Sequence, residues 1–240
     1  NSGSLNFVSA PDYEAKTSYA VLVAASDGTY SSSQLVSISV VNLNDNMPVI
    51  TSPPSVSAIE NEISIQTVTA TDADGDVLSY SLSGTDAASM NINASSGVLK
   101  FNSAPDYEIK TSYLVSITVS DGVNSVSQSL TVNIRDVDDS APVFTSSTEF
   151  SIPESERTIG IVSASDIDSG NINFNLTGGD TDFIYISSLG GDEGNRFAQL
   201  RLRESIDFDQ PNAKTNFIVT MELIDDGLNS SERNISVVIT

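Results

Sequence analysis

The sequence predicts an all-β protein made of immunoglobulin-like Greek-key β-sandwiches joined end to end. Short runs such as Tyr113, Val115, Ile117 and Val119 alternate apolar with polar residues, as in a strand with one buried face. Val, Ile, Ser and Thr dominate these runs, and Gly, Asn, Asp and Pro interrupt them about every 8 to 12 residues. No stretch combines helical spacing with caps. Each sandwich should therefore contain about seven strands.

The chain also repeats itself with a period of 94 residues. The segment Ala10–Glu14 recurs letter for letter as Ala104–Glu108, and matches before and after it keep the same offset. This period is too long for a solenoid unit and fits a string of whole small domains. We expect a partial domain over residues 1–46, a complete domain over 47–140 and a divergent complete domain over 141–240.

The first and third domains depart from the 94-residue unit in different ways. Asn1 aligns with Ser95, so the opening strands of the first domain would lie upstream, and we expect the chain to be part of a longer one. Tyr113 aligns with Phe217, so about ten residues are inserted in the third domain, near Gly190–Asn195. The apolar residues of the first domain that would have only half a core are Leu5, Phe7, Tyr19, Val21 and Val23.

Composition excludes several classes of function. The 32 acidic and 10 basic residues give a formal charge of -22, which cannot supply the basic face that nucleic acids require. Without Cys or His there is no disulfide, zinc finger, thiol nucleophile or Ser-His-Asp triad. With 39% apolar residues the chain can build a core, yet no apolar run approaches a membrane span. Metal chemistry is left to oxygen ligands.

Acidic residues gather at equivalent places in each domain, where a sandwich has its end loops. In the second domain Asp72 and Asp74 follow the second predicted strand, and Asp121 begins a Asp-Gly turn. The linkers Asn42–Pro48 and Asp136–Pro142 occupy equivalent positions between domains. Such loops are often only a solvated surface, and Asp-Gly pairs are common turn formers. The repeated ensemble favours ligands over that simpler interpretation.

These motifs resemble tandem cadherin repeats, of the kind found in large bacterial surface proteins. The family's linker D-x-N-D-N-x-P is similar to Asn42–Pro48, with Asn in first place, and to Asp136–Pro142. Its L-D-R-E resembles Pro105–Glu108, whereas the third domain departs with Asp207–Asp209. Its early P-E-N is similar to the sequence around Glu60 and around Glu154.

The resemblance implies Ca²⁺ bound between successive domains. Two like charges about 6 Å apart repel by about 3 kcal/mol at an effective dielectric near 20, so the carboxylates need counter-charge when they meet. Calcium accepts 6 to 8 oxygens in irregular cages, whereas magnesium sheds its water reluctantly. The ligands implied for the second junction are the side chains of Glu60, Asp106, Glu108, Asp136, Asp138, Asp139, Asp166, Asp168 and Asp225 and the main-chain oxygens of Val137, Ser140 and Asn171.

The first junction is less complete, because the early Glu of the first domain would lie upstream of Asn1. We expect the ion held by Asn44, Asp72, Asp74 and Asp121 to remain, the other two to be weak or absent, and Asp27 to hold none. An EF-hand loop starting at Asp72 is a poorer interpretation, since the later Glu and both helices are missing. The ligands implied here are Asp12, Glu14, Asn42, Leu43, Asn44, Asp45, Asn46, Asp72, Asp74 and Asp121.

Two functional hypotheses follow, and neither is enzymatic. The first is an extracellular segment of a surface adhesin, in which calcium between domains stiffens a stalk; another cadherin-like domain or a surface glycan would be its partner, and only other parts of the parent protein would reach a membrane. The alternative is a polysaccharide-binding or protein-binding module in a secreted protein. Its site would lie in the third domain, near the insertion and the basic stretch Arg196–Arg203. A glycosidase with two carboxylates is the weakest hypothesis.

Overall fold

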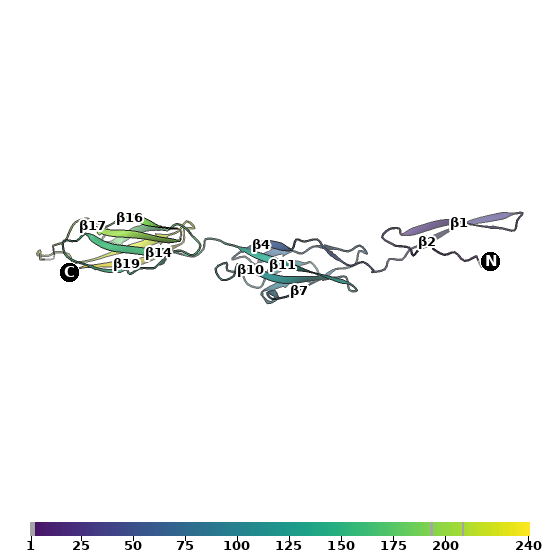
Figure 1. The fold of residues 1–240 in the computed structure, drawn as a ribbon, viewed down its shortest axis with the longest axis horizontal. Helices are drawn as coiled ribbons and strands as arrows, with labels where there is room; N and C mark the ends of the chain where they lie inside the picture. The colour runs from purple at the N-terminus through teal and green to yellow at the C-terminus, as the bar shows by residue number, and fades with distance from the viewer. Residues whose placement is uncertain (1–2, 193, 208) are drawn as a thin grey trace. The chain divides into compact units, whose positions relative to one another are not determined.

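Strands form nearly all the regular structure of the chain in the computed structural model, which describes residues 3–192, 194–207 and 209–240 (Figure 1). Contacts divide the chain into two compact units, Asn1–Arg135 and Asp136–Thr240. In the described part of the chain the helical structure is one 3-10 turn, η1 (Ala87–Ser89). The predicted all-β fold is thus confirmed, while the division of the first unit after residue 46 stays a prediction.

The first unit begins with a two-stranded antiparallel ribbon and continues into a sandwich. In the ribbon Ser18 pairs with Ser39 and Ser26 with Ser31. The sandwich has a four-stranded sheet of order β4-β11-β10-β7, a three-stranded sheet β5-β9-β8 and the short pair β3-β6. The strands are β1 (Ser18–Ser26), β2 (Ser31–Ser39), β3 (Val49–Ile50), β4 (Ser55–Ile59), β5 (Ser64–Thr67), β6 (Ala70–Thr71), β7 (Ser79–Ser83), β8 (Met90–Ile92), β9 (Val98–Phe101), β10 (Ser112–Ser120) and β11 (Ser125–Arg135).

The second unit is a sandwich of two four-stranded sheets. Their orders are β12-β14-β17-β16 and β13-β19-β18-β15, and β13 is parallel to β19. The opening strand is split in both units: β12 and β13 join different four-stranded sheets, whereas β3 pairs with β6 and β4 joins the four-stranded sheet. Each sandwich therefore has more segments than the seven predicted. The strands are β12 (Val143–Phe144), β13 (Glu149–Ile152), β14 (Thr158–Ser165), β15 (Asn173–Gly179), β16 (Ile184–Asp192), β17 (Asn195–Leu202), β18 (Asn216–Ile224) and β19 (Ser230–Ile239).

Alternating residues of the long strands build each core. Val115, Ile117 and Val119 on β10 are fully buried, as their period of two predicts. In the second unit Val219, Met221 and Leu223 on β18 have the same role. Each core ends in loops whose side chains are mostly polar or acidic, and these loops carry the predicted ligands.

The predicted insertion is divided between two places. Met90 and Ile184 begin equivalent strands in the two units, and their residue numbers differ by 94. Met90 pairs with Phe101 and Ile184 pairs with Leu202, and the numbers of these two partners differ by 101. The difference reaches 104 at Phe217, so seven residues lengthen the β16–β17 hairpin and three lie in the loop before β18. Residue 193, in the predicted insertion, lies outside the described residues, as does residue 208 of the divergent motif.

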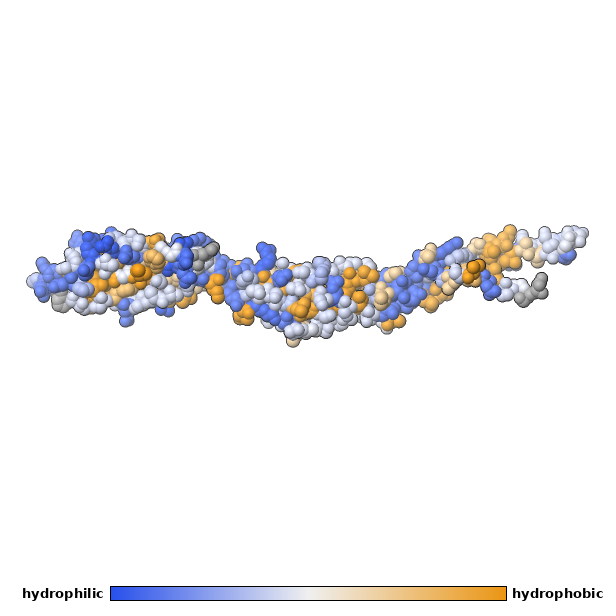
Figure 2. Space-filling view, in the orientation of Figure 1, coloured by the Kyte–Doolittle hydropathy of each residue, from blue (hydrophilic) through white to orange (hydrophobic). Residues whose placement is uncertain are grey.

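The ribbon of the first unit leaves its apolar face open. Leu5 and Phe7 remain about half exposed, and the ring of Phe7 meets Tyr19 edge-on with centroids 5.0 Å apart. With Val21 and Ile38 these residues line a hollow of about 420 Å³. Figure 2 shows apolar residues gathered at the surface over this part of the chain. The ribbon therefore exposes an apolar face.

An ion pair recurs at equivalent positions in the two units. Asp86 accepts hydrogen bonds from Lys110 and from the backbone N–H of Leu114. Asp180 accepts hydrogen bonds from Lys214 and from the N–H of Ile218 in the same way. Each lysine also lies over an aromatic ring, Tyr113 in one unit and Phe217 in the other. The ion pair ties the loop before the β10–β11 or β18–β19 hairpin to the loop that follows the neighbouring strand, β7 or β15.

We expect Asp180→Asn to lower the free energy of unfolding of the second unit by about 1 kcal/mol at pH 7. The bond from Lys214, helped by the Ile218 N–H, lowers the pKa of Asp180. A lowered pKa contributes stability above the unfolded value of about 3.9 and loses it as the pH falls through the folded value. Urea unfolding from pH 7 to pH 3 should show the difference in unfolding free energy becoming smaller below pH 4; a constant difference would contradict this account.

Candidate metal centre

The first cluster of carboxylates lies within the first unit and is organised by the loop after β6. Asp72 begins this loop, and its Oδ1 accepts the backbone N–H of Asp74 at 2.9 Å and that of Asp76 at 3.4 Å. Its Oδ2 is buried and has no hydrogen-bond partner among the described residues. The turn therefore fixes Asp72 with one oxygen free for a ligand.

Asp74 joins this loop to the linker that precedes β3. Its Oδ2 accepts the backbone N–H groups of Asp45 and Asn46 at 3.1 and 2.8 Å, and its Oδ1 accepts the Asn46 amide at 2.9 Å. These bonds lower its pKa, the Asn46 side chain contributing most. Asn42 donates to the Asp74 carbonyl at 2.8 Å, a bond that the family's Asp could not make.

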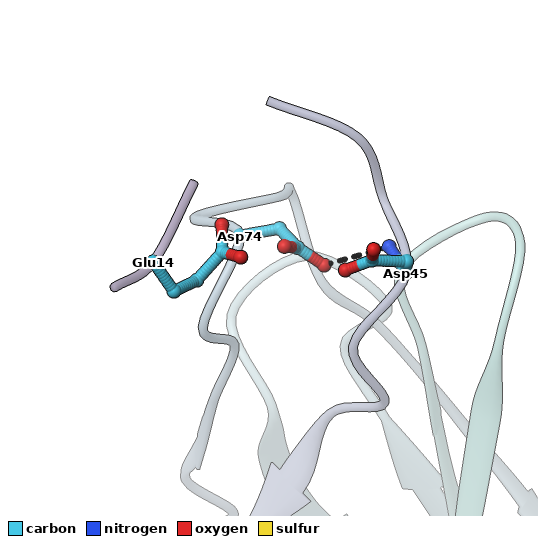
Figure 3. Close-up of side chains that lie close together, drawn as sticks. All are labelled: Glu14, Asp45 and Asp74. Atoms are coloured by element: carbon cyan, nitrogen blue, oxygen red, sulfur yellow. Dashed lines mark hydrogen bonds between the residues drawn. The ribbon is translucent and has the colours of Figure 1, made fainter. Parts of the chain in front are cut away.

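Glu14, Asp45 and Asp74 form a triad in which one oxygen from each side chain lies within 4.8 Å of the others. Figure 3 shows the three carboxylates converging, with Asp74 in the middle. Desolvation, and then the negative charges of Asp74 and Asp12, raise the pKa of Glu14. The cluster is thus short of positive charge, which a cation would supply.

A second triad shares Asp74 and includes Asp72 and Asp76, again with oxygens within 4.8 Å. Asp76 was not among the predicted ligands, although it ends the acidic run that begins at Asp72. Desolvation and the charges of Asp72, Asp74 and Asp121 raise its pKa. Alternate acidic positions in a tight turn were the signal for this residue.

Asn124 is a further residue that the sequence interpretation missed. Its amide donates to Asn44 Oδ1 at 3.0 Å and to the Asn46 carbonyl at 3.2 Å, and so ties the linker to the β10–β11 turn. Asp121 opens that turn; burial raises its pKa, but the N–H groups of Asn124 and Val123 outweigh burial and lower it. Asn229 has the equivalent place in the second unit, after Asp225 and Gly227. The recurrence of an Asn two residues after an Asp-Gly pair was the sequence signal that could have identified Asn124.

The second unit contains a similar cluster near its own beginning. Asp168 Oδ2 accepts the N–H groups of Asp139 and Ser140 at 3.1 and 2.9 Å, as Asp74 does for its linker. Asp166 Oδ1 accepts the N–H groups of Asp168 and Ser169. Desolvation, and then Asp168, raise the pKa of Asp166 to about 6. Asp166 Oδ2, Asp168 Oδ1 and Asp225 Oδ2 are buried, and within the described ranges of the chain none of them has a hydrogen-bond partner.

Asp138 lies against the turn that follows β18. Asn229 donates to its carbonyl at 3.1 Å and to its Oδ1 at 3.2 Å, and a Cβ added at Gly227 would come within 2.7 Å of its carboxyl carbon. Desolvation, and then the charges of Asp225 and Asp168, raise its pKa. A glycine is needed here because of this close approach rather than because of its own backbone angle.

The other predicted ligands lie in loops of the two units, and not all have a free side chain. Glu60 is buried and accepts the N–H of Tyr107 at 2.8 Å, and Asp106 accepts that of Ile109 at 2.9 Å. The Asn171 side chain bonds to Asp226 and accepts from Arg196, so only its predicted main-chain oxygen is left for a metal. The remaining predicted ligands in loops or linkers are Asp12, Leu43, Glu108, Asp136 and Val137. Asp27, which was expected to hold no ion, accepts two backbone N–H groups of its own turn.

The donor sets fit calcium. They are carboxylates and carbonyls on loops, several with a buried oxygen that no hydrogen bond satisfies. Leaving such oxygens unpaired costs free energy, which a bound cation would recover. Calcium tolerates irregular oxygen cages with shared carboxylates, whereas zinc and copper favour the nitrogen and sulfur donors that this chain lacks.

Known sequences that are similar to this chain include cadherins, and part of the chain matches a family model of an Ig domain. The family model of a bacterial Ig domain matches residues 44–135. Human protocadherin Fat 4 is 35% identical over 198 residues, which cover 75% of this chain and 4% of that protein. The fruit-fly Fat-like cadherin-related tumor suppressor homolog is 30% identical over 221 residues, covering 86% and 5%. The chain thus spans a small fraction of the length of these relatives.

Solved structures agree on the fold. Human protocadherin-24 EC1-2 superposes with a TM-score of 0.69 and 23% identity, covering 82% of this chain and 99% of that one. Protocadherin gamma B2 extracellular cadherin domains 3-6 give a TM-score of 0.70 at 23% identity, covering 95% and 61%. No helix in the described part of the chain is long and apolar enough to cross a membrane. The chain therefore consists of β-sandwich repeats with the fold of cadherin extracellular domains.

Proposed function

We propose that this chain binds Ca²⁺ at the ends of its sandwiches, through the carboxylates and carbonyls predicted from the sequence. The observation that carries the proposal is the set of buried carboxylate oxygens, on Asp72, Asp166, Asp168 and Asp225, for which the described residues supply no hydrogen-bond partner. Native proteins rarely leave buried polar atoms unpaired, and carboxylates least of all. Asp72 and Asp166, 94 residues apart, occupy equivalent positions in the two units, so the unpaired oxygen recurs at this position.

Calorimetric titration of the chain with calcium tests this proposal. We expect more than one calcium ion per chain and a higher unfolding temperature with calcium, because a ligand that binds only the folded state stabilises it by about 2.7 kcal/mol at 100 times its Kd. Magnesium at the same concentration should have a much smaller effect. Absence of binding at millimolar calcium, or equal stabilisation by magnesium, would remove the proposal.

We further propose that calcium makes the connections between repeats stiff, in a segment of a cell-surface adhesion protein. The support is that the two linkers are built into the carboxylate clusters, Asp45 and Asn46 on Asp74, and Asp139 and Ser140 on Asp168. A bacterial surface protein is the parent we favour, because the match over residues 44–135 is to a bacterial Ig domain. Removing calcium with a chelator should change the maximum dimension of the chain measured by small-angle scattering. An unchanged maximum dimension would contradict the stiffening.

Asn124→Ala should weaken calcium binding in the first unit about 10-fold to 100-fold, the usual cost of losing a residue that orients metal ligands. The Asn124 amide holds the linker oxygens of Asn44 and Asn46 in place, and its loss leaves them free to turn away. Titration calorimetry of the variant measures the effect. Asn133→Ala is the matched control, because its exposed amide bonds Ser55 Oγ on β4 rather than a linker oxygen of the first cluster. Equal losses in both variants would argue against an orienting role for Asn124.

A further inference from the structure

The outward face of the β14–β17–β16 sheet in the second unit differs in chemistry from the rest of the chain. Along the central strand β17, Ala198, Leu200 and Leu202 point into the core and are buried. The alternate residues Phe197, Gln199 and Arg201 therefore point outward. We name this outward face the β17 face; it comprises Thr158, Ile161, Ser163, Tyr185, Ser188, Gly190, Phe197, Gln199 and Arg201.

No residue of the β17 face is acidic, although 32 of the 240 residues of the chain are. Arg201 lies between Tyr185 on β16 and Thr158 on β14, and Arg203 follows one residue beyond the end of the strand. In the described part of the chain neither arginine lies within ion-pair distance of a carboxylate, and Arg201 Nε is buried without a hydrogen-bond partner. A guanidinium whose charge no carboxylate neutralises is suited to a ligand carboxylate.

Aromatic and amide groups accompany the arginines. The Arg203 guanidinium lies 5.5 Å from the centroid of the Tyr185 ring, a distance at which cation–π attraction orients it. The Phe197 ring lies against Gly190, where an added Cβ would approach it to 2.5 Å, so the ring lies close to the backbone of the sheet. Gln199 accepts hydroxyl hydrogen bonds from Ser187 and Ser188, which leaves its amide N–H groups as donors.

We propose that the β17 face binds an acidic polysaccharide whose repeating units are uronic acids. The rings of Phe197 and Tyr185 offer apolar contact to sugar rings, Gln199 offers donors to hydroxyls, and Arg201 and Arg203 bind the carboxylates. Residues two apart on a strand are about 7 Å apart, so the face extends for about 20 Å from Phe197 to Arg203, enough for several sugars. Figure 2 shows apolar and strongly hydrophilic residues side by side on this unit, where Figure 1 places the three strands.

A polysaccharide fits this face better than an acidic peptide. Extended peptides are usually bound by adding a strand to a sheet edge, where their backbone groups find partners. Arg201 stands on β17, which has strands on both sides, so a peptide over it could not pair with the backbone. The net charge of -22 does not forbid an anionic ligand, because at physiological salt charges are screened beyond about 8 Å.

The equivalent position in the first unit provides an internal control. Lys100 on β9 takes the place of Arg201, and its neighbours are Ser64 and Asn91 instead of Thr158 and Tyr185. The first unit thus has a positive charge there without the aromatic neighbour. The proposal concerns a face apart from the carboxylate clusters, so it holds or fails independently of calcium binding.

The test is titration of the full chain, in buffer with fixed calcium, with an oligogalacturonate of about ten sugars. We expect binding that weakens with salt, that is at least about tenfold weaker in Arg201→Gln, as befits the loss of a charged hydrogen bond, and that weakens again in Phe197→Ser. Lys100→Gln should bind as the unchanged chain does. Because Arg201 points outward, thermal melts should show that its variant remains folded.

Four outcomes would overturn the proposal. These are no binding at millimolar oligogalacturonate, equal binding of a neutral oligosaccharide of the same length, equal losses in Arg201→Gln and Lys100→Gln, and binding unaffected by Arg201→Gln, which would indicate bridging by calcium. Poly-glutamate that binds as tightly, with the same dependence on Arg201 and none on Phe197, would identify an acidic peptide as the ligand instead.

Discussion

Asp168→Ala is expected to abolish the binding of at least one calcium ion, and to weaken calcium binding in the second unit by at least about 100-fold. Losing a residue that merely orients a metal ligand already costs about 10-fold to 100-fold. Asp168 does more, because its Oδ2 holds the linker N–H groups of Asp139 and Ser140 while its buried Oδ1 is left for the ion. Ion counting by calorimetry or by elemental analysis of the dialysed chain measures the loss.

The control for Asp168→Ala is Glu222→Gln. Glu222 is a half-buried residue within β18, paired with Asn175 and Glu232, and it is not among the predicted ligands. The change removes the same charge from the same unit. If net charge alone governed calcium uptake, the two variants would lose equally. If Asp168→Ala lost no ion, the assignment of ligands in the second unit would be wrong, even with the sandwich intact.

The sequence predicted the fold because its signals are local. Alternation on β10 and β18 identifies the buried face, and a 94-residue register places Asp74 and Asp168 after equivalent strands. The same register places each linker in front of its sandwich. Both aspartates do hold linker N–H groups, as expected for residues at one end of the sandwich.

What the sequence did not predict depends on contacts between distant segments. Asn124 and Asn229 look like ordinary turn residues, and only the folded chain shows each amide donating to a linker 78 to 91 residues away. The insertion of about ten residues was assigned to one hairpin, because an alignment with a single offset cannot show that three of them lie in the loop before β18. Outward residues such as Arg201 and Tyr185 are far apart in sequence and acquire meaning only from strand pairing.

Phe217→Ala is expected to destabilise the second unit by about 3 to 5 kcal/mol, the usual cost of removing a buried aromatic ring. Phe217 is 1% exposed and belongs to that core, with its ring centroid 5.4 Å from that of Phe183. Phe217→Leu should cost much less, since it retains most of the volume. In a calorimetric scan the melting temperature of the second unit should fall by more than about 10 °C.

The same scan tests whether the two units fold separately. Phe101 has the equivalent role in the first unit, where its ring lies 5.0 Å from Tyr113, so Phe101→Ala is the matched variant. In the presence of a chelator we expect two unfolding transitions, and each substitution should lower the melting temperature of only one of them. The reason is that the two core clusters share no residue. With calcium bound, both transitions should move together if ions couple neighbouring repeats, since unfolding one would release ligands of the other. Two transitions that remain independent in calcium would leave calcium as a local stabiliser and remove its stiffening role.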